Sequence, residues 1–160
     1  EGEEKQQCYN CSLLLLSPSD SPSCFSCSLP ILPPELTDSL SPSSSSSPPL
    51  SPLPFFSFLN LMGLVVFMGE GVDVVVLEVG VGGRGDTTNV FEKPRVAAVS
   101  LLDYDHQLVL GDTIEEIAWQ KAGIFKENAP AYIVPQVPGA VEVFKNEANN
   151  VHCSSLSIAL

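Results

Sequence analysis

Residues 72–79 form a nearly unbroken run of apolar, mostly β-branched side chains, and Gly80 follows it directly. A strand with one wet face would alternate apolar and polar residues, so this run indicates a central strand of a sheet that is covered on both faces. Glu78 interrupts the run one residue before its end. Because a carboxylate there is costly unless it binds a cation or accepts hydrogen bonds, the run predicts a strand that ends at a functional site.

The sequence downstream alternates between strand and helix patterns. We predict strands at residues 96–101 and 131–134, a helix capped by Asp112 or Thr113 and running to residue 125, and an amphipathic helix at residues 139–150. Upstream, residues 55–68 are apolar nearly all round, which predicts a buried helix that glycines end. This order is typical of an open, mostly parallel α/β sheet flanked by helices, where ligands bind beyond the carboxyl ends of the strands.

The first third of the chain has a different composition. Serine and proline dominate residues 8–54, apart from a short leucine run at residues 13–16. This composition predicts a disordered or extended segment without a core of its own. We therefore divide the chain into a Ser/Pro-rich segment, residues 1–52, and a partial α/β domain, residues 53–160. The apolar stretch at residues 53–68 is slightly short for a membrane span and lacks basic flanks, so a core helix is preferred.

The charge balance narrows the classes of partner. Lys and Arg number 7 and Asp and Glu number 19, which gives a formal net charge of −12. No basic residue occurs between Lys5 and Arg84. Nucleic acids and anionic membrane surfaces are bound by clusters of Lys and Arg, so neither is expected as a partner.

A glycine-rich loop at residues 80–89 is the first candidate site. Gly82 and Gly83 would let the backbone approach a phosphate or a metal closely, and Asp86 and Asn89 would add oxygen ligands or hydrogen bonds. Oxygen ligands of this kind suit Mg²⁺. The alternative is a tight turn beside a solvated Glu78. The loop does not fit a dinucleotide fingerprint, because no capped helix follows it directly.

Two further side chains could join that site. His106 follows Asp105 just beyond the second predicted strand, where a neutral imidazole could bind a metal or orient a water, or could simply lie on the surface. Lys121 sits near the end of an apolar-faced helix. Taken alone it favours a lysine that extends to solvent, and the alternative is an inward lysine that binds phosphate or is chemically modified.

Two C-x-x-C pairs, Cys8 with Cys11 and Cys24 with Cys27, match a structural zinc pattern. The spacing between the pairs is slightly short and no glycine follows either pair, so coincidence in a biased segment is preferred over a zinc-binding interaction module. Cys153 has no partner by spacing, and no disulfide framework is implied.

Four motifs together resemble the folylpolyglutamate synthases, a family of Mur-ligase-like ATP-dependent amide ligases. The motifs are residues 74–89, the Asp105-His106 pair, residues 110–113 and residues 117–126. They occur in the order and spacing of the family, and the resemblance runs from about residue 52 to residue 150, the later part of the central domain.

The resemblance implies ATP-dependent addition of glutamate to the γ-carboxylate of folate through an acyl phosphate. It implies Mg²⁺ held by Glu78 and His106, with a carbamylated Lys121 helping a second ion, so that Lys121 and His106 take part in catalysis. It further implies that the glycine-rich loop shapes the nucleotide and metal site through Gly82, Gly83, Asp86 and Asn89. A cytoplasmic or mitochondrial location also follows from the resemblance.

The sequence departs from the family in several respects, including Thr87, which replaces the small or polar residue common after the loop aspartate. The phosphate-binding pattern G-x-x-x-x-G-K-[ST] does not occur in the 160 residues, and Asp103 stands where members usually carry glycine. We therefore expect weak or no ATP binding by these residues alone. The alternatives are a catalytically inactive fragment or a dihydrofolate synthase-type ligase.

Overall fold

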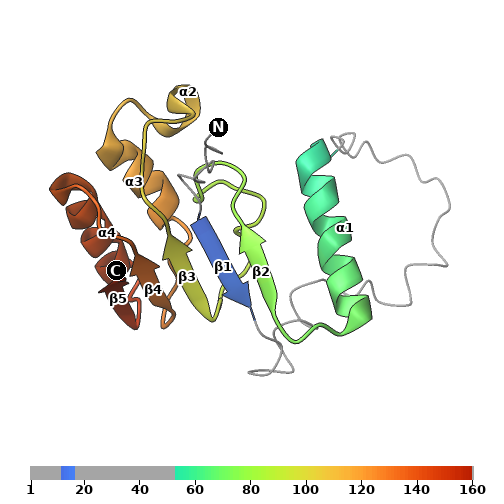
Figure 1. Ribbon diagram of the computed structural model, residues 1–160. Helices are drawn as coiled ribbons and strands as arrows, with labels where there is room; N and C mark the ends of the chain where they lie inside the picture. The colour runs from blue at the N-terminus through green and yellow to red at the C-terminus, as the bar shows by residue number, and fades with distance from the viewer. Residues whose placement is uncertain (1–11, 17–52, 160) are drawn as a thin grey trace, which may run out of the picture. The chain divides into compact units, whose positions relative to one another are not determined.

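The computed structural model describes residues 12–16 and 53–159. The chain divides into two compact units: residues 1–17 with 73–160, called the sheet unit, and residues 18–72, called the helix unit. The described strands of the sheet unit form one sheet in the order β2-β1-β3-β4-β5 (Figure 1). They are β1 (Ser12–Leu16), β2 (Val75–Glu78), β3 (Val96–Val99), β4 (Pro130–Ile133) and β5 (Ser155–Ile158).

The sheet is mixed, with one reversed strand. β1 pairs antiparallel with both β2 and β3, whereas β3 with β4 and β4 with β5 pair parallel. Strands β2, β3, β4 and β5 therefore run in the same direction, which confirms the mostly parallel α/β fold expected from the sequence. Strand β5 was not predicted.

Strand β1 lies within residues 1–52, for which the sequence predicted a disordered or extended segment without a core of its own. Leu14 is fully buried, and its register places it beside Leu77 of β2 and Ala97 of β3. Burying one leucine side chain contributes about 1.5–3 kcal/mol, and the leucine run contains no proline to interrupt the backbone ladder. A short apolar run inside a Ser/Pro-rich segment is thus sufficient to complete a sheet. The rest of residues 1–52 lies outside the described residues.

Three helices accompany the sheet: α2 (Gln107–Leu110), α3 (Ile114–Ala122) and α4 (Pro138–Asn150). α3 and α4 pack against one face of the sheet and against each other (Figure 1). Their junction includes Phe125 and Phe144, whose ring centroids are 5.8 Å apart. Thr113 is the N-cap of α3, and its side chain forms a capping box with Glu116. Of the two caps predicted, Asp112 and Thr113, the structure thus has Thr113. α2 was not predicted.

The other face of the sheet is more open than the sequence predicted. Val76 of β2 is 55% exposed and Tyr132 of β4 is 41% exposed, whereas Leu77 and Val79 belong to the core side. The expectation that the apolar run is covered on both faces is therefore wrong for β2 within the described part of the sheet unit. Hydrophobic patterning shows which residues can be buried, but a second packed layer must exist to bury them.

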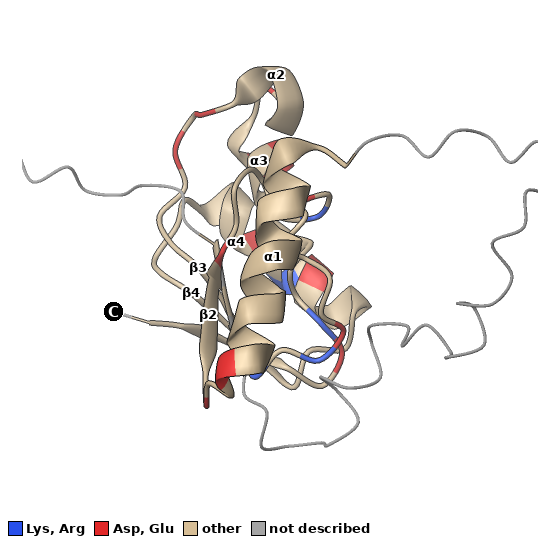
Figure 2. Cartoon of the chain, turned by 90° about the vertical axis from the view of Figure 1, so that its right-hand side faces the viewer, with Lys and Arg blue, Asp and Glu red and all other residues tan. Residues whose placement is uncertain are grey.

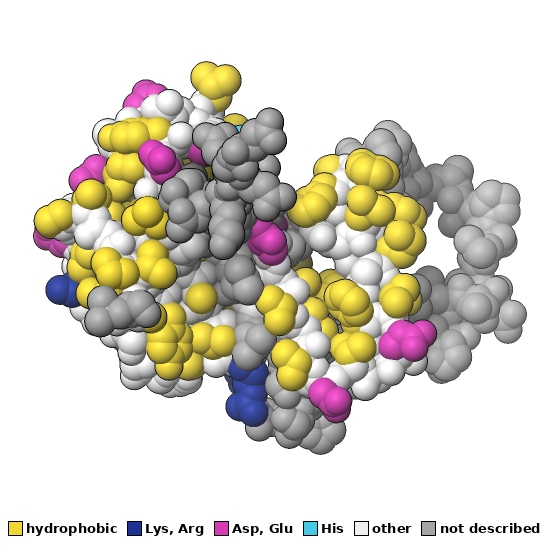
Figure 3. Space-filling model, in the orientation of Figure 1, with side chains coloured by type: hydrophobic (Ala, Val, Ile, Leu, Met, Phe, Trp, Pro, Cys, Tyr) yellow, Lys and Arg dark blue, Asp and Glu magenta, His cyan; other side chains and the backbone are white. Residues whose placement is uncertain are grey.

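Helix α1 (Phe55–Glu70) belongs to the helix unit and confirms the predicted helix at this position. It ends at Gly71, which takes the left-handed conformation with φ of 62° and donates its N–H to Met68 O. Within the described part of the helix unit, none of the residues of α1 is buried. Glu70 is the one charged residue of α1 (Figure 2), and apolar side chains lie along much of the helix surface that Figure 3 shows. None of the described helices is long and apolar enough to cross a membrane.

Candidate active site

The carboxyl ends of β2 and β3 lie at the same edge of the sheet, because these strands run in the same direction. Glu78 is the last residue of β2, and the glycine-rich loop leaves the sheet directly after it. His106 lies in the segment that follows β3 and precedes α2. Both side chains are exposed. The edge of the sheet is thus the place where a carboxylate and an imidazole from separate parts of the chain are presented to solvent.

The backbone at His106 is in an uncommon conformation. His106 has φ of 49° and ψ of 35°, in the left-handed region that residues other than glycine rarely occupy. Its N–H donates to Asp105 Oδ1 at 2.7 Å, and its Nε2 lies 3.6 Å from Asp105 Oδ2. Such backbone strain is often found at functional sites, where the surrounding structure holds it in place.

Asp86 organises the glycine-rich loop from within. Its Oδ1 accepts hydrogen bonds from Thr88 N at 2.9 Å and Thr88 Oγ1 at 2.6 Å, and its Oδ2 accepts one from Val81 N at 3.0 Å. Burial raises the pKa of Asp86, but the hydrogen bonds from the Thr88 side chain and from three backbone N–H groups outweigh it and hold the pKa below its ordinary value. Asp86 is therefore ionised at neutral pH and fixes the shape of the loop.

Asn89 joins the loop to the end of α3. Its Nδ2 donates to Arg84 O at 3.2 Å and to Gly123 O at 3.0 Å. Its Oδ1 is buried and accepts no hydrogen bond from the part of the chain that the structure describes. The amide thus bridges two segments that are far apart in the sequence.

Gly82 and Gly83 permit close approaches to two helices. A Cβ at Gly82 would lie 2.7 Å from the Leu110 side chain of α2, and Gly83 approaches the end of α3. The two glycines have φ of 69° and 155°, and a Cβ at Gly83 would lie 3.0 Å from Gln120 O and 3.1 Å from Lys121 O. The sequence predicted that these glycines let the backbone approach a phosphate or a metal. What the structure shows is that Gly83 lets the loop pass against the last turn of α3.

Lys121 is 3% exposed and lies on the buried side of α3. Its position on the helix, taken alone, favoured a side chain that extends to solvent. The structure shows that the side chain is buried instead. Burying an ammonium group costs free energy unless the group is paired or chemically altered.

Arg84 is the member of this region that the sequence reasoning missed. Its Nη2 donates to Trp119 O at 3.2 Å and forms an ion pair with Glu147, and its guanidinium carbon lies 3.8 Å from the centroid of the Trp119 ring. These contacts cross 35 and 63 residues of sequence, so no local pattern could have revealed them.

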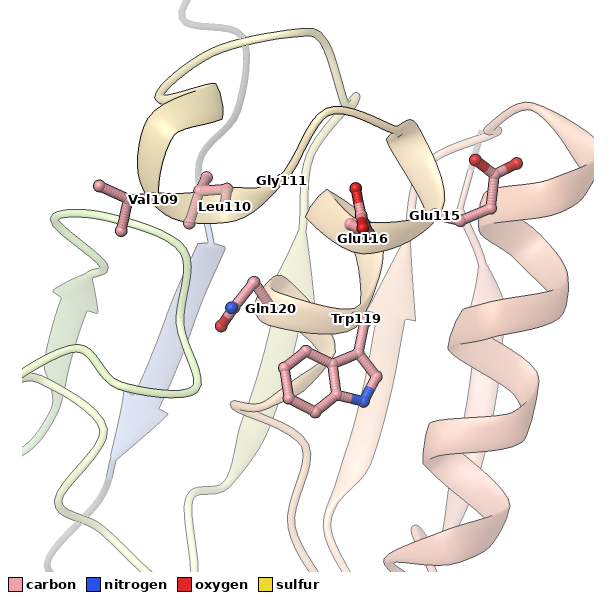
Figure 4. Close-up of a pocket in the computed structure, with 7 residues that line it drawn as sticks. All are labelled: Val109, Leu110, Gly111, Glu115, Glu116, Trp119 and Gln120. Atoms are coloured by element: carbon pink, nitrogen blue, oxygen red, sulfur yellow. The ribbon is translucent and has the colours of Figure 1, made fainter.

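A cavity of about 510 Å³ lies beside α2 and α3, close to this region (Figure 4). Its lining combines apolar side chains, two glutamates, an amide and an indole. The lining residues are Val109, Leu110, Gly111, Glu115, Glu116, Trp119 and Gln120.

Within residues 12–16 and 53–159, no group of three or more His, Cys, Asp and Glu side chains lies close enough to hold a metal ion. The metal ligands expected from the sequence are Glu78, His106 and Lys121, of which only two are of these residue types. The cysteine pairs at Cys8, Cys11, Cys24 and Cys27 lie outside the described residues, and Cys153 is a free thiol.

No family model matches the chain. The chain is 50% identical over 100 residues to the mitochondrial folylpolyglutamate synthase of Homo sapiens, a match that covers 62% of this chain and 17% of that protein. It is 53% identical over 94 residues to a probable folylpolyglutamate synthase of Schizosaccharomyces pombe, covering 59% and 19% of the two chains. The chain therefore spans less than a fifth of the length of these relatives.

Solved structures agree with the sequence matches. The apo form of the L. casei folylpolyglutamate synthase matches with a TM-score of 0.62 and 36% identity, over 67% of this chain and 25% of that one. A complex of a folylpolyglutamate synthase with AMPPCP and folate matches with a TM-score of 0.63 and 36% identity, over 66% and 26% of the two chains. About two thirds of this chain is thus similar to about a quarter of folylpolyglutamate synthase structures, one of which is a complex with AMPPCP and folate.

Proposed function

We propose that this chain, which is homologous to the folylpolyglutamate synthases, is part of the central domain of an ATP-dependent ligase that joins glutamate to folate. The observation that carries the proposal is identity of about half over 94 to 100 residues with relatives of that name. The similar structure that holds AMPPCP and folate supports ATP and folate as substrates. Nothing favours the inactive-fragment or dihydrofolate synthase alternatives over this assignment.

The proposed reaction forms one amide bond. The γ-carboxylate of folate attacks the terminal phosphorus of ATP, which gives an acyl phosphate and ADP. The amine of glutamate then attacks the acyl carbon, inorganic phosphate leaves, and the amine loses a proton. Phosphoryl transfer of this kind depends mainly on positioning the reactants and on neutralising the charge that develops on the phosphates.

Two side chains at the edge of the sheet are the proposed ligands of a divalent cation. Glu78 is an exposed carboxylate at a strand end, and His106 is an exposed imidazole held in a left-handed backbone conformation beside Asp105. We assign Mg²⁺ to these two residues, and the ion would neutralise phosphate charge when bound. Lys121 cannot ligate a cation as an ammonium, but a carbamate on its Nζ would supply oxygen atoms of the kind that Mg²⁺ prefers.

The glycine-rich loop would support this site by its shape. Asp86 holds the loop closed through its own hydrogen bonds, and Asn89 ties it to the turn after α3. Gly82 and Gly83 let the loop lie against the helix that carries Lys121. The loop is proposed to bind the nucleotide through backbone groups. The carboxylate oxygens of Asp86 already accept hydrogen bonds inside the loop.

A ligase assay tests the proposal. The full chain is mixed with ATP, Mg²⁺, glutamate and a reduced folate, and glutamylated product is measured by mass spectrometry. Because the sequence contains no phosphate-binding motif, the matched segment is also exchanged into the human relative. We expect an active chimera that loses at least about tenfold in rate with Lys121→Ala and is unchanged by Lys145→Ala, an exposed lysine on α4. A folded chimera without activity would contradict the assignment.

The human relative is named as a mitochondrial protein. We propose the cytoplasm or the mitochondrion as the location of the complete protein. Fractionation of cells that express the tagged chain, with immunoblotting of each compartment, tests this assignment.

A further inference from the structure

We propose that Arg84 is a positioning residue that caps the carboxyl-terminal end of α3 from outside the helix and thereby sets the position of Lys121. The inference rests on the proposed function in one respect, namely that the turn held by Arg84 carries the lysine of the site. The capping consists of hydrogen bonds from Arg84 to Gln120 O and Trp119 O, which do not depend on the function of the site.

The last turn of α3 receives hydrogen bonds from the residues that follow it, such as Gly123 N to Gln120 O at 3.2 Å, and in addition from the glycine-rich loop. The final carbonyl groups of a helix have no partner within the helix, and many helices end on a left-handed glycine that supplies one. α3 ends at Gly123 in the right-handed conformation instead, with φ of −60°. Arg84 N donates to Gln120 O at 2.8 Å, and Arg84 Nη2 donates to Trp119 O at 3.2 Å. Arg84 thus serves two carbonyl oxygens of this turn.

The guanidinium group is suited to this place for three physical reasons. It puts a positive charge at the negative end of the helix dipole. Its planar face stacks on the Trp119 ring at 3.8 Å. The same Nη2 also pairs with Glu147 of α4, where the two side chains are 35% and 14% exposed. A lysine could supply the charge but not the flat, forked group that stacks and donates at once.

Lys121 lies in the turn that Arg84 holds. Gln120, whose carbonyl accepts from Arg84 N, precedes it directly, and the backbone of Arg84 packs against Gly123, where a Cβ would lie 2.4 Å from Arg84 Cα. The side chain of Lys121 is almost fully buried. If the turn loosened, the backbone of Lys121 would shift and its Nζ would leave its buried position.

The test uses the full chain and compares Arg84→Gln with Thr113→Ala. Thr113→Ala weakens the opposite end of α3 without touching Arg84, so it is a control for simple loss of stability. Modification of Lys121 by an amine-acylating reagent is followed by peptide mass spectrometry. We expect Arg84→Gln to speed acylation of Lys121 roughly tenfold, which corresponds to about 1.4 kcal/mol, and Arg84→Lys to restore protection only in part. Equal acylation in Arg84→Gln and Thr113→Ala would overturn the inference, and so would unchanged acylation in Arg84→Gln.

A second readout separates this inference from the proposed function. ¹³C NMR of the chain in ¹³C-bicarbonate detects a carbamate on Lys121, and Lys121→Arg identifies the signal. A carbamate signal in the wild-type chain that weakens in Arg84→Gln supports both the proposed role of Lys121 and the positioning role of Arg84. A wild-type chain with no carbamate signal would contradict the proposed role of Lys121, whereas the acylation comparison would still decide whether Arg84 positions the turn.

Discussion

The side-chain nitrogen of Asn89 donates a 3.0 Å hydrogen bond to the carbonyl oxygen of Gly123, which joins the glycine-rich loop to the turn after α3. At the same turn, a Cβ on Gly123 would lie 2.3 Å from Arg84 Cβ and 2.4 Å from Arg84 Cα. The loop and the helix end therefore pack backbone against backbone, and any side chain at Gly123 would have to push them apart.

We expect Gly123→Ala to lower the free energy of unfolding by about 1–3 kcal/mol, because the new methyl group would collide with backbone atoms that cannot move aside easily. Gly85→Ala is the matched control in the same loop, since a Cβ there meets nothing within 4 Å. Urea unfolding followed by circular dichroism measures both variants. Equal destabilisation by the two substitutions would show that the close approach at Gly123 is not what limits this position.

Asp86→Asn should destabilise the protein in a pH-dependent way. The folded protein holds the pKa of Asp86 below its ordinary value of 3.8, so its contribution is fully present above pH 3.8 and is lost as the pH falls through the folded pKa. We expect a loss of about 1 kcal/mol at pH 7, since the site is only half-buried, and a difference that shrinks as the pH falls below 3.8. Urea unfolding across this pH range measures it.

The control for this series is Glu142→Gln, an exposed carboxylate on α4. The free energy of unfolding of Glu142→Gln should equal that of the wild type at each pH. A difference between Asp86→Asn and wild type that stays constant down to the lowest pH would mean that the charge of Asp86 does not stabilise the loop.

Thr113→Ala should lower the free energy of unfolding by about 1 kcal/mol, because it removes the acceptor for Glu116 N at the start of α3. Thermal unfolding followed by circular dichroism measures the change. Ser154→Ala, at an exposed position outside the helices, serves as the comparison. A variant with unchanged stability would show that the capping box does not stabilise the folded chain.

Replacing apolar residues on α1 should reduce self-association. Phe58 and Val65 are each 52% exposed, and large exposed apolar patches on a protein favour association. We expect Phe58→Gln with Val65→Gln to lower the apparent mass in light scattering and to leave the circular dichroism of the sheet unit unchanged. Ser57→Gln is the control on the same helix. An unchanged apparent mass would mean that α1 does not mediate association.

Much of the local structure could be predicted because adjacent residues encode it. The apolar run that forms β2, the cap at Thr113 and the glycine that ends α1 are all visible as short patterns. Burial was predicted less well. β2 is a strand as its pattern requires, yet Val76 is 55% exposed, since burial depends on a second surface that the pattern does not contain.

The amino-acid sequence by itself determined the order of strands and helices, the glycine-rich loop and the kinds of side chain available to the site. Tertiary structure alone decided that residues 12–16 pair between β2 and β3, that Lys121 is buried, and that Arg84 reaches Trp119 and Glu147. The physical reason is the separation along the chain of the residues that interact. Hydrogen bonds within a turn or helix join near neighbours in the chain, whereas strand pairing and side-chain burial join residues that only the folded backbone brings together.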